Sequence, residues 1–169
     1  MVDNELVPVP EAPLLPVDPT HLQSARRGMF EVMNGARGTA KSARIADDTM
    51  LMAGKTGTAQ VRNISAAERA AGVVSNDQLP WERRDHALFV CYAPFDRPKV
   101  AVSLVVEHGG GGSTVAAPIA RDILLNCLTG GGIPPLSAYP SAQRGRIETQ
   151  FKEMKLRDLG DVTPGKSRA

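Results

Sequence analysis

Two near-continuous apolar runs constrain the fold of this chain more than any other feature of its sequence. They occupy residues 86–94 and 100–108, and a short connection of sequence Phe-Asp-Arg-Pro-Lys joins them. Runs without polar alternation are typical of strands that are covered on both faces. Residues 96–98 suit a hairpin turn. The sequence therefore predicts two adjacent antiparallel strands, buried on both faces of a sheet.

A third strand is predicted upstream of these two. Residues 51–61 read LMAGKTGTAQV, which is rich in small and β-compatible residues, and we place a strand from about Ala53 to Val61. The polar residues 62–85 then form a long connection. A connection of this length is either functional or a disordered excursion, and the sequence leaves both interpretations open. The three strands together predict an antiparallel meander.

Two helices are predicted to flank the sheet. Asp18 and Pro19 suit an N-cap and a first helical residue, and apolar residues recur at helical spacing through residues 21–34. A second helix is predicted over residues 113–128. Its apolar side is expected to carry Ile119, Ile123, Leu124, Cys127 and Leu128. The predicted fold class is therefore α+β, an antiparallel sheet with flanking helices.

The 169 residues suffice for one domain. Residues 1–19 contain several prolines and are expected to form an extended lead-in. Residues 20–130 carry the predicted strands and helices. Residues 131–169 are charged, with a weak amphipathic patch that allows a short helix, and are expected to be a loosely ordered tail.

Composition excludes several classes of function. The net charge of +2 argues against a nucleic-acid partner, which would require a clustered basic excess. The histidines and cysteines lack metal-ligand spacing, so no metal or other cofactor is expected. Cys91 and Cys127 are interpreted as small core residues without a disulfide between them. No leader and no membrane-spanning run are expected within the chain.

The triplet Lys55, Thr56 and Gly57 is the motif that carries chemistry. On an edge strand, free backbone groups can pair with an extended peptide, and a glycine lets that peptide approach closely. Lys55 supplies a positive charge for an anionic substrate end or for a hydroxyl proton network. Thr56 can hydrogen-bond a carboxylate. Taken alone, the triplet favours a plain structural interpretation, with Lys55 a solvated strand lysine and Thr56 a β-forming residue.

The context of the triplet extends this interpretation. The stretches MAGKTGTAQV, DHALFVCYAP and GGGGSTVAAPIARDIL resemble those of class B penicillin-binding proteins of the elongation type, the penicillin-binding protein 2 group. The resemblance covers about residues 15–128 and implies part of the fold shared with serine β-lactamases. It also implies that the backbone N–H of Thr58 belongs to an oxyanion hole. Lys55, Thr56, Gly57 and Thr58 would then form the substrate-binding strand.

The resemblance also implies a reaction and its setting. A family member is a peptidoglycan D,D-transpeptidase, which cross-links stem peptides and is acylated by β-lactam antibiotics. It acts at the periplasmic face of the bacterial inner membrane, beside a membrane glycan polymerase of the elongation machinery. These activities, substrates and partners are expectations of the resemblance alone.

The family nucleophile is a serine with lysine three residues later, and no serine of this chain has that neighbour. None has asparagine two residues later, so the second family motif is absent as well. We therefore expect an N-terminally truncated transpeptidase that cannot run the acyl-enzyme cycle alone. The alternatives are a β-lactamase-like fragment and a non-catalytic binding or scaffold domain.

The glycine-rich residues 109–112 are followed by Ser113 and Thr114. A phosphate-binding loop would need lysine at the position of Gly112, so a plain strand-to-helix turn is favoured. Glu107 and His108 precede this turn. They are interpreted as residues of the surface or of the surroundings of the site, with no acid–base role.

Overall fold

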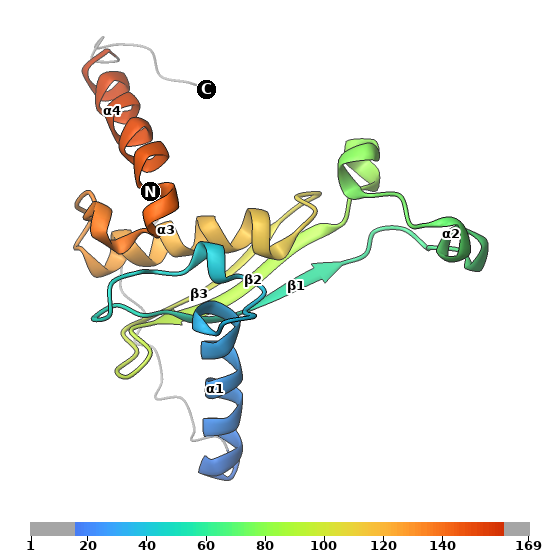
Figure 1. Ribbon diagram of the computed structural model, residues 1–169, viewed down its shortest axis with the longest axis horizontal. Helices are drawn as coiled ribbons and strands as arrows, with labels where there is room; N and C mark the ends of the chain where they lie inside the picture. The colour runs from blue at the N-terminus through green and yellow to red at the C-terminus, as the bar shows by residue number, and fades with distance from the viewer. Residues whose placement is uncertain (1–15, 161–169) are drawn as a thin grey trace, which may run out of the picture.

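The computed structural model describes residues 16–160, with side chains described through Met154. Its centre is a three-stranded antiparallel sheet of order β1-β2-β3 (Figure 1). The strands are β1 (Ala53–Ala59), β2 (His86–Ala93) and β3 (Val100–Val106). The predicted α+β class and the antiparallel meander are confirmed.

One face of the sheet is buried against helix α3 (Ala117–Leu128). Thr56 pairs with Phe89 and Phe89 with Leu104 across the strands. Residues directly opposite each other in antiparallel strands share a face, so these three side chains all point to α3. Phe89 is fully buried there and belongs to the core.

On the other face of the sheet, α1 covers one end, where Arg26 bonds to the Tyr92 hydroxyl, and the rest of the face is open among the described residues. Lys55 pairs with Val90 and Val90 with Ser103, so these side chains share this face. Val90 is 44% exposed and Val105 is 57% exposed. The prediction that both faces are buried is therefore wrong for the described residues. Valine is favoured in strands whether or not its side chain is covered, so an apolar run does not specify the cover.

Helix α1 (Pro19–Asn34) begins as predicted, with Asp18 at the N-cap and Pro19 in the first turn. The carboxylate of Asp18 accepts a hydrogen bond of 2.8 Å from the backbone N–H of Thr20. At the other end, the side-chain amide of Asn34 donates to the carbonyl of Met52 over 3.0 Å. This bond joins the end of α1 to the entry of β1, and the rest of the helix projects from the sheet (Figure 1).

The segment before α3 differs from the predicted single helix. Residues Gly112–Ala116 form one wider π-helical turn, and the α-helix begins only at Ala117. Pro118 explains the change. A proline ring clashes with the carbonyl four residues earlier in an α-helix and donates no hydrogen bond, so regular helix cannot run from 113 through 118.

The buried side of α3 also differs from the prediction. Ile119 and Ile123 are about two-fifths exposed, at 42% and 39%, and Cys127 is exposed. The buried residues of α3 are Ala117, Ala120, Arg121, Leu124 and Leu125. Because alanine is small, these alanines let the helix approach the sheet closely. The predicted apolar side was based on the larger side chains and therefore left the alanines out. Both cysteines are free, and Cys91 alone is buried.

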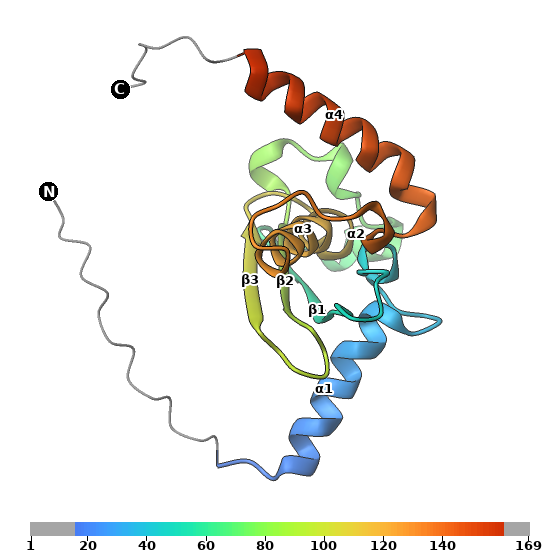
Figure 2. The same ribbon diagram turned by 90° about the vertical axis from the view of Figure 1, so that its left-hand side faces the viewer.

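The segment after α3 is more closely packed than the sequence suggests. Helix α4 (Arg144–Gly160) lies beyond α3, on the side away from α1 (Figure 2). Tyr139 and Ile147 are almost fully buried and belong to the same core as the sheet. The domain boundary near residue 130 and the loose tail stay predictions, and residues 1–15 and 161–169 lie outside the described part. Within residues 16–160, no helix has the length and hydropathy needed to cross a bilayer.

A buried arginine ties this segment to the core. The side chain of Arg121 is 1% exposed and donates to Asp122 over 2.9 Å and to the Gln143 side chain over 2.8 Å. Its guanidinium lies 4.7 Å from the centre of the Tyr139 ring. The Gln143 amide in turn donates to the carbonyl of Ser42 over 2.6 Å. The network therefore joins α3 to segments on both sides of it in the sequence.

Replacing Arg121 by methionine should lower the free energy of unfolding by about 2 kcal/mol. Methionine keeps most of the volume but leaves the partly buried oxygen of Gln143 without its donor. Urea unfolding followed by circular dichroism measures the change. Arg146 is exposed and serves as the control, because Arg146→Met should shift the same value by less than about 0.5 kcal/mol. Equal effects of the two substitutions would contradict a structural role of Arg121.

Candidate functional site

Strand β1 is an edge strand. It pairs with β2 on one side, and no other strand of residues 16–160 pairs with its second side. In an edge strand, every second residue directs its backbone N–H and C=O away from the neighbour. Lys55, Thr56, Gly57 and Thr58 lie in the middle of β1. They therefore border a line of backbone donors and acceptors that an extended peptide can pair with.

The side chains of Lys55 and Thr56 stand on opposite faces of this edge. Lys55 is exposed on the open face, and its ammonium donates to the backbone carbonyl of Thr56 over 2.8 Å. Thr56 is half-buried on the α3 face, and Thr58 is exposed. A ligand along the edge would thus lie between the two side chains. Their predicted binding roles, and that of the Thr58 N–H, stay predictions.

Two glycines bring the turn before α3 against β1. A Cβ atom on Gly112 would lie 2.5 Å from the carbonyl oxygen of Gly57 and 2.6 Å from that of Leu88. Both neighbours are backbone atoms in a hydrogen-bonded sheet, so they cannot move aside at low cost. The glycine at 112 is therefore required by close backbone packing. This packing agrees with the predicted strand-to-helix turn and does not suggest a phosphate-binding loop.

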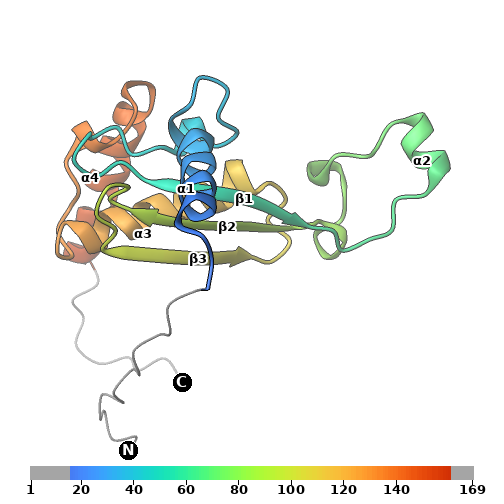
Figure 3. The same ribbon diagram turned by 90° about the horizontal axis from the view of Figure 1, so that it is seen from below.

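The connection between β1 and β2 forms an arm that projects past the ends of the strands, carrying α2 (Ala66–Ala71) (Figures 1 and 3). Two hydrogen bonds of 2.7 and 2.6 Å join the guanidinium of Arg62 to the carboxylate of Glu68. These bonds hold the pKa of the Glu68 carboxyl below its ordinary value. Ser65 caps α2 by accepting from the Glu68 N–H over 3.1 Å. The arm thus has defined local structure and leaves directly from the end of the candidate strand.

A cluster of aromatic rings at the base of the arm was not predicted from the sequence. The backbone N–H of His108 donates to Nδ1 of His86 over 2.9 Å. The His108 ring centre lies 4.3 Å from that of Trp81 and 4.7 Å from that of His86. The three residues come from three separate segments, so no local spacing signals the cluster. The one available signal was the position of His108 directly before the glycine turn.

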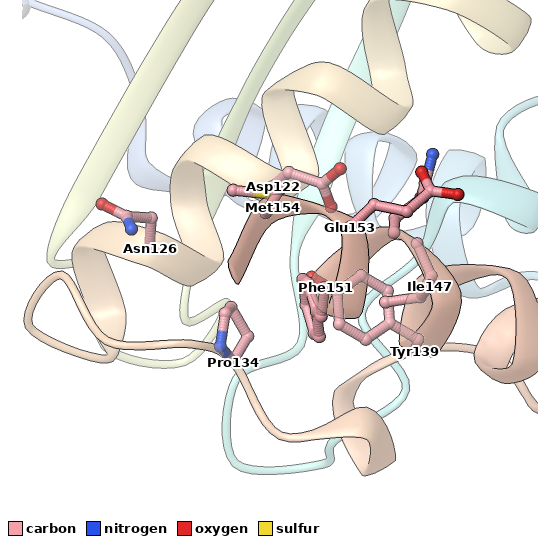
Figure 4. Close-up of a pocket in the computed structure, with 9 residues that line it drawn as sticks. Asp122, Asn126, Pro134, Tyr139, Ile147, Phe151, Glu153 and Met154 are labelled. Carbon is pink, nitrogen blue, oxygen red and sulfur yellow. The ribbon is translucent and has the colours of Figure 1, made fainter. Parts of the chain in front are cut away.

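A cavity of about 440 Å³ lies between α3 and α4, away from β1 (Figure 4). Tyr139, Ile147 and Phe151 line it together with the carboxylates of Asp122 and Glu153. Burial raises the pKa of Tyr139 to about 12, so the phenol is neutral at ordinary pH. The cavity includes none of residues 55–58, and the candidate site is therefore the exposed strand edge.

The fold and the strand motif belong to a class of protein that comparison with known proteins identifies. The family model for the penicillin-binding protein transpeptidase domain matches residues 5–125. The chain belongs to this family, and its similarity is to the class B type represented by PBP2 and MrdA.

Curated relatives support the narrower type. The peptidoglycan D,D-transpeptidase MrdA of Haemophilus influenzae is 43% identical over 102 residues, which cover 60% of this chain and 15% of that protein. MrdA of Escherichia coli K12 is 32% identical over 120 residues, covering 71% of this chain and 18% of that protein. The chain therefore spans less than a fifth of the length of these relatives.

Solved structures agree in fold. PBP2 of Pseudomonas aeruginosa matches with a TM-score of 0.50 and 38% identity over 71% of this chain and 23% of that one. PBP2 of Helicobacter pylori, solved as a complex with MreC, matches with a TM-score of 0.50 and 33% identity over 67% of this chain and 18% of that one. The predicted resemblance to the penicillin-binding protein 2 group is thus confirmed.

Proposed function

We propose that the chain is the C-terminal part of the catalytic domain of a peptidoglycan D,D-transpeptidase. It supplies the substrate-binding strand, and a serine outside residues 1–169 supplies the nucleophile. The observation that carries the proposal is the Lys-Thr-Gly strand at a free sheet edge, with a lysine exposed on one face. Family membership and the MrdA relatives support the same reaction.

The proposed chemistry is acyl transfer from a stem peptide that ends in D-alanyl-D-alanine. The serine Oγ forms an ester bond with the penultimate carbonyl carbon, the C–N bond breaks, and the departing amine of D-alanine takes up a proton. An amine of a neighbouring strand then attacks the ester and restores the serine. β-Lactams acylate the same serine.

Each residue of the strand has a role in this proposal. Lys55 and Thr56 flank the edge and bind the terminal carboxylate of the stem peptide. The backbone of β1 pairs with the peptide, and the N–H of Thr58 donates to the oxyanion. One such donor stabilises a transition state by about 3 kcal/mol. Gly57 keeps side-chain atoms away from the bound backbone.

Two observations support a larger polypeptide around this chain. The chain covers 15% and 18% of the MrdA relatives from Haemophilus influenzae and Escherichia coli K12. The open sheet face also exposes Val90 and Val105, which a further layer of the domain would cover. We place the complete protein at the periplasmic face of the inner membrane, with a glycan polymerase as partner. The MreC complex of a relative supports assembly with other proteins.

Two other functions compete with this proposal. A β-lactamase-like fragment would share the strand, but the matched relatives are named transpeptidases. A scaffold domain would use the free edge of β1 without any acyl transfer. Acylation of the complete protein separates the scaffold from both enzymes, and slow release of the acyl group separates a transpeptidase from a β-lactamase.

The isolated chain of residues 1–169 should form no covalent adduct with a fluorescent penicillin. No serine in it has the lysine neighbour that activates the family nucleophile. Intact-mass spectrometry after incubation is the measurement. The full-length protein is the positive control, and it should be acylated on a serine outside residues 1–169. An adduct on a serine of the chain would refute the proposed division of roles, and an unreactive full-length protein would favour the scaffold.

A further inference from the structure

The backbone of His108 has a conformation that needs support. Its φ angle is 53°, in the left-handed region that residues other than glycine adopt only occasionally. Its ring Nδ1 lies 2.9 Å from the carbonyl of Arg84, and since a carbonyl only accepts, this nitrogen carries the proton. The ring also packs against Trp81. The side chain of His108 is therefore held in place by this hydrogen bond and by its packing against Trp81.

His86 holds the same residue through its backbone. The N–H of His108 donates to Nδ1 of His86 over 2.9 Å, so Nδ1 of His86 must be free of a proton. The neutral ring with its proton on Nε2 is the form that can accept this bond. Protonation of Nδ1 turns the acceptor into a donor and breaks the bond.

Neighbouring bonds join this pair to both ends of the arm. The N–H of Gly110, in the glycine turn, donates to the carbonyl of Asp85 over 2.8 Å. The carboxylate of Asp85 accepts from the backbone N–H of Val61 and from the side chain of Asn76, each over 3.2 Å. Val61 follows the end of β1, so Asp85 and His86 connect the glycine turn, the arm and the candidate strand.

The glycine turn reaches the candidate strand itself. Gly112, at the end of the turn, is packed against the backbone of Gly57, where a Cβ atom would be 2.5 Å from the carbonyl oxygen. Gly57 is adjacent to Thr58, whose N–H is the proposed oxyanion donor. A displacement of the turn would therefore also change the position of the Thr58 N–H.

We propose that neutral His86 is a positioning residue, whose Nδ1 holds the backbone of His108 and so fixes residues 109–112 against the strand at Gly57 and Thr58. The role depends on the proposed function of that strand. Loss of the bond loosens the turn and slows acylation.

Two substitutions separate the two nitrogens of the His86 ring. In His86→Asn the side-chain oxygen can occupy the place of Nδ1 and accept from the N–H of His108. In His86→Gln the oxygen reaches the place of Nε2 and leaves the N–H of His108 unpaired. The asparagine variant should keep the acylation rate within about twofold of wild type, and the glutamine variant should lose about five- to tenfold.

Rescue by the asparagine variant gives a readout that a merely structural role would not show. Both substitutions remove the imidazole ring, and only asparagine keeps an acceptor for the N–H of His108. His21 is exposed on α1, and His21→Gln should leave the rate unchanged.

The experiment has two parts. Nitrogen-15 NMR of the isolated chain determines the tautomer of His86 without any reference to activity. Stopped-flow acylation of the full-length protein by a fluorescent penicillin then gives the rates of wild type and variants. A proton on Nδ1 of His86 at neutral pH, a wild-type rate for His86→Gln, or equal losses for both His86 variants would overturn the inference. A full-length protein with no acylation at any pH would contradict the proposed function instead, and the NMR result would still decide the bond.

Discussion

Replacement of Lys55 by alanine in the full-length protein should lower the rate of acylation by penicillin about tenfold to hundredfold, with an unchanged melting temperature. The ammonium is exposed and its one hydrogen bond is to the adjacent carbonyl of Thr56, so its removal leaves no cavity. Penicillins and stem peptides both carry a carboxylate. A charge-assisted hydrogen bond to a carboxylate contributes about 1.5 to 3 kcal/mol, which corresponds to that range of rates.

The measurement is the second-order acylation rate, read beside a thermal melt. Lys55→Arg should recover only part of the rate, because the planar guanidinium is larger and directs its donors differently. Lys99, an exposed lysine in the connection between β2 and β3, is the matched control, and Lys99→Ala should leave the rate unchanged. A wild-type rate for Lys55→Ala would remove Lys55 from the site, and a collapsed melting temperature would make the residue structural.

The second large effect is expected at Gly112. Substitution by alanine should lower the free energy of unfolding by about 3 kcal/mol and the melting temperature by about 10 °C. The added Cβ would overlap the carbonyl oxygens of Gly57 and Leu88, which the sheet holds in place. The turn must then move away from β1. Acylation of the full-length protein should fall as well, because the displaced turn lies against the candidate strand.

A glycine in an open position provides the control for this experiment. Gly145 lies in α4, and a Cβ atom added there would have no neighbour within 4 Å, so alanine should be neutral or stabilise by up to about 1 kcal/mol. Both variants can be compared in the isolated chain by thermal melting. A Gly112→Ala variant as stable as Gly145→Ala would show that the close packing of the turn is not required.

The strands were predictable because their signals are local. The apolar runs and the hairpin residues determined the order and the antiparallel pairing of β2 and β3 from neighbours in the sequence. The burial of α3 was not predictable in the same way. Which side of a helix faces a sheet depends on how closely the two approach. Arg121 is buried because Gln143 and Tyr139, from later in the sequence, pack against it.

In the candidate site, too, some residues were predictable from the sequence and others were not. Lys55 and its neighbours were found because a short motif marks them and its strand is contiguous. The contact between His86 and His108 depends on a backbone N–H and on a left-handed residue, neither of which residue type reveals. Likewise, the need for glycine at position 112 arises from the backbone of another strand, which only the three-dimensional structure brings close.

The two ends of the arm meet where Asp85 accepts a hydrogen bond from Val61. Since this junction closes the loop, the residues between the two ends contribute little to the pairing of β1 with β2. The entropy cost of closing a flexible loop rises by only about 0.6 kcal/mol for each doubling of its length. Insertions, deletions and exchanges around α2, away from Asn76, Trp81 and Arg84, are consequently tolerated by the sheet. Evolution can thus diversify the surface beside the strand edge while the register that presents Lys55 is inherited unchanged.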